Sequence, residues 1–146
     1  MDINPNWIAL IVASLSTLVV GFIWYNPKVF GTIWMNEIGM TEEKAKKANM
    51  PLIFGLSVVL AFLVSFTLMM MVMTGGGPGE MQHGIEQNMT FKHGAFHGAL
   101  LGIFVVLPVV VTNGLYEQRS FKYMMVVTGY WIVSFAIMGG IINAWP

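Results

Sequence analysis

The sequence predicts an all-α integral membrane protein, a four-helix transmembrane bundle that forms one domain over residues 1–146. The composition supports this: 56% of the residues are hydrophobic and only 10% are charged, whereas ordinary soluble domains carry about 25% charged residues. The spacing of the charges is more specific. No charge lies in 3–27, 48–79, 93–116 or 123–146. Each interval exceeds the roughly 20 apolar residues that cross a bilayer as a helix.

These intervals predict helices at about 6–25, 51–74, 91–112 and 123–145. Trp7, Trp24 and Trp145 stand near predicted ends, where interfacial aromatic residues are common. The stretch G-G-G-P-G ends the second helix. Pro108 lies inside the third helix, where proline removes a backbone donor, so we expect a kink or one loosened turn there.

The basic residues predict the orientation of the chain. Six of the seven lie in the loops that join helices one to two and three to four: Lys28, Lys44, Lys46, Lys47, Arg119 and Lys122. Only Lys92 lies on the other side. By the positive-inside rule these two loops are cytoplasmic and both termini are periplasmic or extracellular. We expect a multi-pass protein of the bacterial inner membrane whose first partner is the lipid bilayer.

The first cytoplasmic loop carries signals for a short surface helix. Thr41 is a suitable N-cap, Glu42 and Glu43 follow in the first turn, and three lysines come later. This order complements the helix dipole. We therefore predict a helix at about 42–49.

Each predicted span contains small residues at every fourth position. Transmembrane helices associate through such stripes because small side chains let backbones approach closely. The stripes are Ala9, Ala13, Thr17 and Gly21; Ser57, Ala61 and Ser65; Gly94, Gly98 and Gly102; and Ala136, Gly140 and Ala144. The pattern predicts a compact bundle, or a bundle with an oligomer contact.

Several kinds of chemistry find no support in the sequence. The chain has no cysteine, which excludes disulfides and thiolate metal sites. Apart from Lys92, at the outer end of the third, no Asp, Glu, Lys or Arg lies within a predicted span, although intramembrane ionisable residues mark proton relays and coupled transport. The net charge is zero, which gives no sign of a nucleic-acid partner. We expect neither an enzyme nor a bound cofactor.

Two histidines of the third helix are candidate metal ligands near a span. His93 and His97 stand four residues apart and could supply two imidazole ligands, with His83, Glu80 or Glu86 from the preceding loop completing a metal site. Nearby methionines would suit Cu(I). The alternative is that methionine fills apolar space and that Lys92 and His93 simply end the span at the interface.

A second group of candidate residues lies at the cytoplasmic ends of helices one and three. Aromatic, amide and charged residues here could line a shallow pocket or hold the two hairpins in register, and the alternative is an ordinary interfacial belt. The candidates are Trp24, Tyr25, Asn26, Pro27, Phe30, Trp34, Asn113, Glu117 and Arg119.

Three stretches give the chain a family resemblance: G-F-I-W-Y-N-P-K-V-F-G-T-I-W, N-G-L-Y-E-Q-R-S and G-Y-W-I-V-S-F-A-I-M-G-G-I-I-N-A-W. Together they resemble a bacterial membrane family known as domain of unknown function 1761. The resemblance extends over the full length and implies a four-helix membrane protein without an assigned activity. It transfers no catalytic residue. It directs attention to Gly21, Gly31 and most of the cytoplasmic candidates.

These observations lead to three hypotheses about function. The first is a packing or partner protein that forms a homo-oligomer or an accessory subunit of a membrane complex. The second is a small oligomeric transporter or channel for a neutral or apolar solute. The third is a periplasm-facing metal binder that uses His83, His93 and His97. The small-residue stripes and the absence of buried charge favour the first.

Overall fold

The structure is a computed structural model that describes residues 5–74 and 89–145. The described chain is helical, and four of its helical stretches are long and apolar enough to cross a membrane. This confirms the four spans. His83 and the G-G-G-P-G stretch lie outside the described residues.

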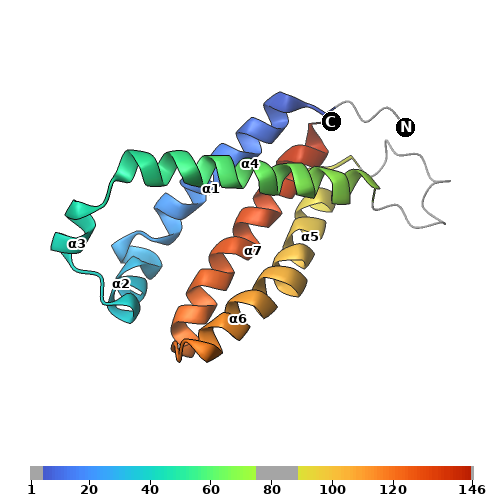
Figure 1. The fold of residues 1–146 in the computed structure, drawn as a ribbon. Coiled ribbons are helices and arrows are strands. Elements are labelled where there is room, and N and C mark those ends of the chain that lie inside the picture. The colour runs from blue at the N-terminus through green and yellow to red at the C-terminus, as the bar shows by residue number, and fades with distance from the viewer. Residues whose placement is uncertain (1–4, 75–88, 146) are drawn as a thin grey trace.

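The elements follow the predicted order (Figure 1). They are α1 (Trp7–Trp24), the π-helical turn η1 (Pro27–Gly31), α2 (Thr32–Ile38), α3 (Glu42–Lys47), α4 (Met50–Thr74), α5 (Phe91–Leu101), the π-helical segment η4 (Gly102–Val106), α6 (Leu107–Tyr116) and α7 (Phe121–Ala144). The third span is one turn longer than predicted and runs from Phe91 to Tyr116.

Polar side chains begin the helices at the expected places. Asn6 Oδ1 accepts the N–H of Ala9 at 3.1 Å, and Thr41 Oγ1 accepts the N–H of Lys44 at 3.3 Å. Ser120 Oγ accepts the N–H of Tyr123 at 3.1 Å. Each bond satisfies a first-turn donor that the helix itself leaves unpaired. The Thr41 cap confirms the predicted start of α3.

Pro108 loosens the third span as predicted. Proline has no N–H, so the α-helical bond to the carbonyl four residues earlier is lost. The turn before it widens: η4 is π-helical, and the N–H of Leu107 bonds to the carbonyl of Gly102, five residues back. The span continues through the π turn as α6.

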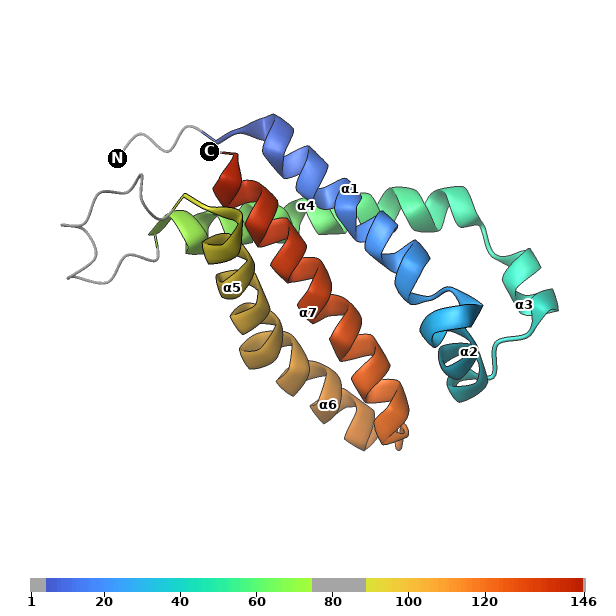
Figure 2. The ribbon, with the colours of Figure 1, turned by 180° about the vertical axis from the view of Figure 1, so that it is seen from behind.

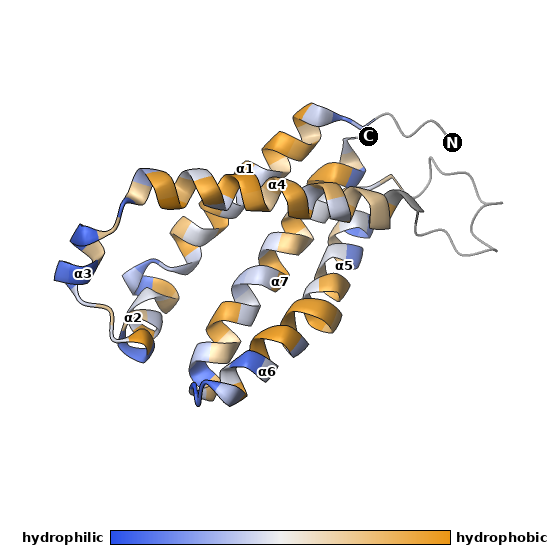
Figure 3. Ribbon diagram, viewed as in Figure 1, coloured by the Kyte–Doolittle hydropathy of each residue, from blue (hydrophilic) through white to orange (hydrophobic). Residues whose placement is uncertain are grey.

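The helices α1, α7 and the α5–α6 span lie side by side, and α4 crosses them obliquely (Figures 1 and 2). Hydrophilic residues gather at α3, at the end of α2 and at the α6–α7 turn (Figure 3). The long helices that lead away from these segments are mostly apolar. The core lies where α4 crosses, and consists of Leu10, Ala13, Leu68, Met69, Phe135, Met138 and Ile142.

The closest helix contact joins α5 to α7. A Cβ built on Gly94 would overlap the carbonyl oxygen of Gly139, and one built on Gly98 would overlap that of Phe135. At Gly102 the nearest atom is Ile132 Cα, at 2.8 Å from the added Cβ. The glycines thus let two backbones touch, which maximises van der Waals contact where lipid and side chain are equally apolar.

The stripes on the other helices also face neighbours. Ser65 of the α4 stripe is buried, and its hydroxyl oxygen lies 3.2 Å from that of Ser14, which is next to Ala13 of the α1 stripe. Gly140 lies under the ring of Phe91, and Gly21 faces the ring of Tyr130. The small residues are therefore used largely within one chain.

The α5–α7 contact gives a direct test. Gly98→Ala should lower the free energy of unfolding by about 1–3 kcal/mol, because the new methyl group meets backbone rather than a flexible side chain. The measurement is reversible unfolding in mixed detergent micelles. Gly55→Ala is the matched control, because a Cβ on Gly55 meets nothing within 4 Å. Equal changes in the two variants would contradict the packing account.

Candidate functional site

The first candidate site is a tight turn after α1. The side chain of Asn26 caps it: Oδ1 accepts the N–H of Lys28 at 2.9 Å. The N–H of Gly31 bonds to the carbonyl of Asn26, five residues back, at 2.9 Å, so the turn is π-helical. Pro27 fits here because the first position of a helical turn needs no backbone donor.

Gly31 is required by the closeness of the chain to itself. A Cβ at this position would overlap the carbonyl oxygen of Tyr25 and lie 2.8 Å from the carbonyl carbon of Asn26. The neighbouring atoms are backbone, which cannot move aside without undoing the turn. Any other residue would therefore open it.

The turn gathers four aromatic rings, those of Trp24, Tyr25, Phe30 and Trp34, which we call the aromatic turn. The rings of Trp24 and Phe30 have centroids 4.5 Å apart, and those of Tyr25 and Trp34 are 5.2 Å apart. These separations lie within the range of favourable aromatic pairs. The four rings therefore pack against one another in two pairs on the turn.

The aromatic turn is fastened to α7. The indole Nε1 of Trp24 donates to the carbonyl oxygen of Val126 at 3.0 Å. The same ring covers Gly129, where an added Cβ would lie 2.7 Å from Cζ2 of Trp24. The glycine therefore makes room for the indole.

Tyr25 and Tyr130 extend this contact toward the membrane interior. Their ring centroids are 5.3 Å apart, and the Tyr130 hydroxyl donates to the carbonyl oxygen of Thr17 at 3.1 Å. Burial, together with the neighbouring Tyr130 and Tyr123, raises the pKa of the Tyr25 phenol well above its ordinary value. Tyr25 is thus a neutral hydroxyl at physiological pH.

The structure separates the candidates predicted at the cytoplasmic ends of helices one and three into two groups. The aromatic turn packs on α7, whereas Asn113, Glu117 and Arg119 are exposed at the end of α6. Arg119 Nε lies 3.2 Å from Glu117 Oε2, and its guanidinium lies over the ring of Tyr123 at 5.3 Å from the centroid. Exposed pairs of this kind contribute little to stability. Whether either group binds a ligand remains a prediction.

A further hydrogen bond between the two hairpins comes from residues outside the predicted set. The hydroxyl of Ser120, at the start of α7, donates to the carboxylate of Glu37 in α2. Gly139 and Gly129 are further contact residues that the fourfold spacing missed. Their position becomes evident only when the facing helix is known.

The histidine pair lies near the start of α5. The ring centroids of His93 and His97 are 4.4 Å apart, edge to face. Among residues 5–74 and 89–145, no group of three His, Cys, Asp or Glu side chains is placed to hold a metal ion. The third residue of the hypothesis, His83, is outside these ranges, so the metal site stays a prediction.

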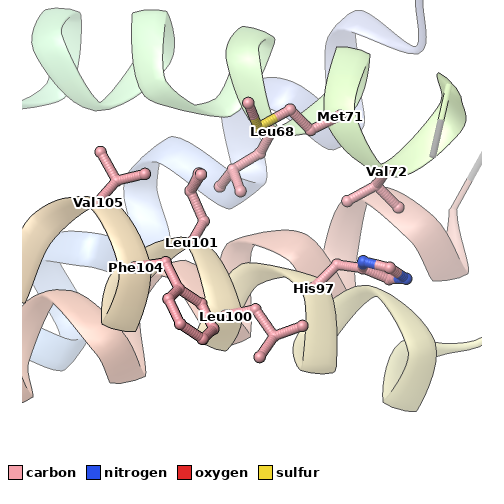
Figure 4. Close-up of a pocket in the computed structure, with 8 residues that line it drawn as sticks. All are labelled: Leu68, Met71, Val72, His97, Leu100, Leu101, Phe104 and Val105. Carbon is pink, nitrogen blue, oxygen red and sulfur yellow. The ribbon is translucent and has the colours of Figure 1, made fainter.

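A groove of about 230 Å³ lies between α4 and the α5–η4 segment (Figure 4). It is lined on the α4 side by Leu68, Met71 and Val72, and on the other side by His97, Leu100, Leu101, Phe104 and Val105. Among the lining residues that the structure describes, His97 alone is ionisable.

Comparison with known proteins agrees with this architecture. The family model described as "Protein of unknown function (DUF1761)" matches residues 8–143. The chain belongs to this family. No curated protein and no solved structure matches it. In this DUF1761 member, the W-Y-N-P-x-x-F-G-x-x-W stretch is accounted for by the backbone and ring contacts of the aromatic turn.

The centre of the described bundle is filled by side chains. Leu10, Leu68 and Met138 are each 1% exposed or less where α1, α4 and α7 meet. The transport hypothesis therefore needs a pathway between copies or a different conformation.

Trp24→Phe tests the attachment of the aromatic turn. It keeps an aromatic ring but removes the indole donor to Val126, so we expect a loss of about 1–2 kcal/mol in the free energy of unfolding. The matched control is Trp7→Phe, whose ring is half-exposed and stacked on Phe62. A control that loses as much as Trp24→Phe would refute a specific role for this bond.

Proposed function

We propose that this DUF1761 member is a non-catalytic membrane subunit that self-associates through the first half of α4. Met50–Thr74 forms one continuous helix, but only its second half is anchored. Between residues 50 and 60, all of which are described, no side chain is buried. From residue 61 onward Ala61, Ser65, Leu68 and Met69 are buried.

The open space beside Gly55 supports a contact with another protein chain. This glycine lies in the unpacked half of α4, and a Cβ added there would meet nothing within 4 Å. Every other described glycine within the four spans has a neighbour inside that distance. Glycine inside a helix costs about 0.5–1 kcal/mol relative to alanine. A second helix that approaches closely would offset this cost.

A second copy is the simplest occupant of this surface. A two-fold interface uses the same patch on both partners, so one glycine provides the close approach for both helices. The exposed apolar side chains around it, Leu52, Leu56 and Val59, would then cover those of the partner. A crossing at Gly55 would repeat between chains the Gly94–Gly139 contact seen within one.

The proposed orientation places α3 and the α6–α7 turn in the cytoplasm of a bacterial inner-membrane protein, with both termini outside. The Glu37–Ser120 hydrogen bond supports it, because it joins the lysine-bearing first loop to the turn that carries Arg119. Six basic residues then share one side of the membrane, as the positive-inside rule requires.

The absence of cysteine makes the orientation easy to measure. Glu43→Cys and Met89→Cys each introduce one thiol into an otherwise cysteine-free chain. Glu43 lies in α3, before the start of α4, and Met89 lies after α4, just before the start of α5. In intact cells, a membrane-impermeant maleimide should label Met89→Cys and should reach Glu43→Cys only after permeabilisation. The reverse pattern would overturn the orientation without affecting the self-association proposal.

Self-association is tested by Gly55→Ile. The new side chain meets open space within one chain, so the free energy of unfolding of the monomer should not fall. The dissociation constant of the dimer in lipid bilayers should rise roughly tenfold or more, which corresponds to about 1.4 kcal/mol. The measurement is energy transfer between donor- and acceptor-labelled copies of Glu43→Cys.

Val19→Phe is the control, since it adds bulk to an exposed position of α1. A wild-type chain that stays monomeric at every protein-to-lipid ratio would overturn the proposal. A rise in the dissociation constant of the control equal to that of Gly55→Ile would overturn it as well.

A further inference from the structure

We infer that the groove between α4 and α5–η4 is a phospholipid-binding site that takes an acyl chain along its length and a phosphate at its histidine end. This site is separate from the Gly55 surface, because it involves the last turns of α4 rather than the first half. It does not depend on self-association.

The shape and lining of the groove fit a hydrocarbon chain. Of the eight lining residues within the described ranges, seven are apolar, and they belong to membrane-spanning helices. An occupant therefore enters from the bilayer rather than from water. The side chain of Phe104, 72% exposed on the π-helical segment, forms one rim (Figure 4).

His97 lines one end of this groove, and His93 lies one turn before it on α5. His93, His97, Leu101 and Phe104 follow one another at four, four and three residues, so they share one stripe of the helix. The glycines that contact α7 form the adjacent stripe. The helix thus presents its backbone to α7 and its histidine–apolar stripe to the groove.

The depth of the histidines suits a lipid headgroup. At 1.5 Å per residue, His93 and His97 lie roughly 3 and 9 Å along α5 from its first residue, Phe91. The hydrocarbon core is about 30 Å thick. The pair therefore spans the boundary between headgroups and acyl chains, with the apolar part of the groove deeper in the same leaflet.

Three basic side chains near this end of the bundle, Lys92, His93 and His97, favour phosphate as the polar group. They are the ionisable side chains that the structure describes here; Glu80, His83 and Glu86 of the preceding loop lie outside the described residues. Imidazole N–H groups and a lysine at the interface can donate to phosphate oxygens, and hydrogen bonds to a charged acceptor are the stronger class. The lysine is exposed and can extend toward the headgroups.

The experiment uses the full chain in phosphatidylcholine vesicles that contain a phosphatidylglycerol carrying a photoactivatable diazirine in one acyl chain. After illumination, mass spectrometry locates the adducts. We expect them to concentrate on Met71 and on residues 100–105 rather than on exposed α1 residues such as Val19 and Phe22. An even distribution over the exposed apolar surface would overturn the site.

Groove-filling variants make the test specific. Val105→Trp and Met71→Trp place a large ring on opposite walls and should each reduce groove adducts roughly tenfold. Val19→Trp, on a similarly exposed valine of α1, should leave them unchanged. Unfolding curves identify a variant that fails to fold, and the variant on the opposite wall of the groove is then used for the test. Undiminished adducts in a folded groove variant would overturn the proposal.

The phosphate is tested separately with a diazirine-bearing diacylglycerol, which has the same chains but no phosphate. The wild type should give several-fold fewer adducts with this probe. The double variant His93→Leu, His97→Leu should remove the difference between the two probes. Equal labelling of the wild type by both probes would overturn the assignment of the histidine end to phosphate.

Discussion

The backbone contact between α5 and α7 is the constraint on which the rest of the structure depends. Within a bilayer no hydrophobic effect drives helices together, so stability comes from close van der Waals packing. Gly94 and Gly98 meet the backbone of Gly139 and Phe135 directly. This contact fixes the rotation of α5 about its axis. The rotation in turn sends the histidine stripe toward α4 and leaves Pro108 and its π turn beside the groove.

The other contacts of α7 fasten the remaining elements to this pair. The indole of Trp24 joins the C-terminal end of α1 to α7, and Asn143 Nδ2 donates to the carbonyl oxygen of Thr90 at 2.8 Å near the opposite end of the bundle. Helix α7 is therefore the central element of the bundle. The buried residues of α4 lie in its second half, and no side chain between residues 50 and 60 is buried.

Contacts within the chain also explain the W-Y-N-P-x-x-F-G-x-x-W motif. Asn26 caps the turn, Pro27 begins it, Gly31 permits it, and the aromatic rings fill it. The motif therefore specifies the turn that joins α1 to α2. The two surfaces that we propose for function, the first half of α4 and the groove at His97, are among those that the bundle does not use for its own packing.

The sequence alone determined the class of the protein, because the positions of the charges dictate which stretches can enter lipid. It also determined the four spans, the capping of α3 by Thr41 and the loosened turn before Pro108, since each follows from local chemistry. It did not determine that Gly139, rather than Gly140, opposes Gly94, nor that Glu37 bonds to Ser120. Small residues at fourfold spacing occur on every helix here, so spacing cannot pair them. Only the tertiary structure, through the rotation and crossing of the helices, decided which glycines meet, which one stays free, and what the two histidines face.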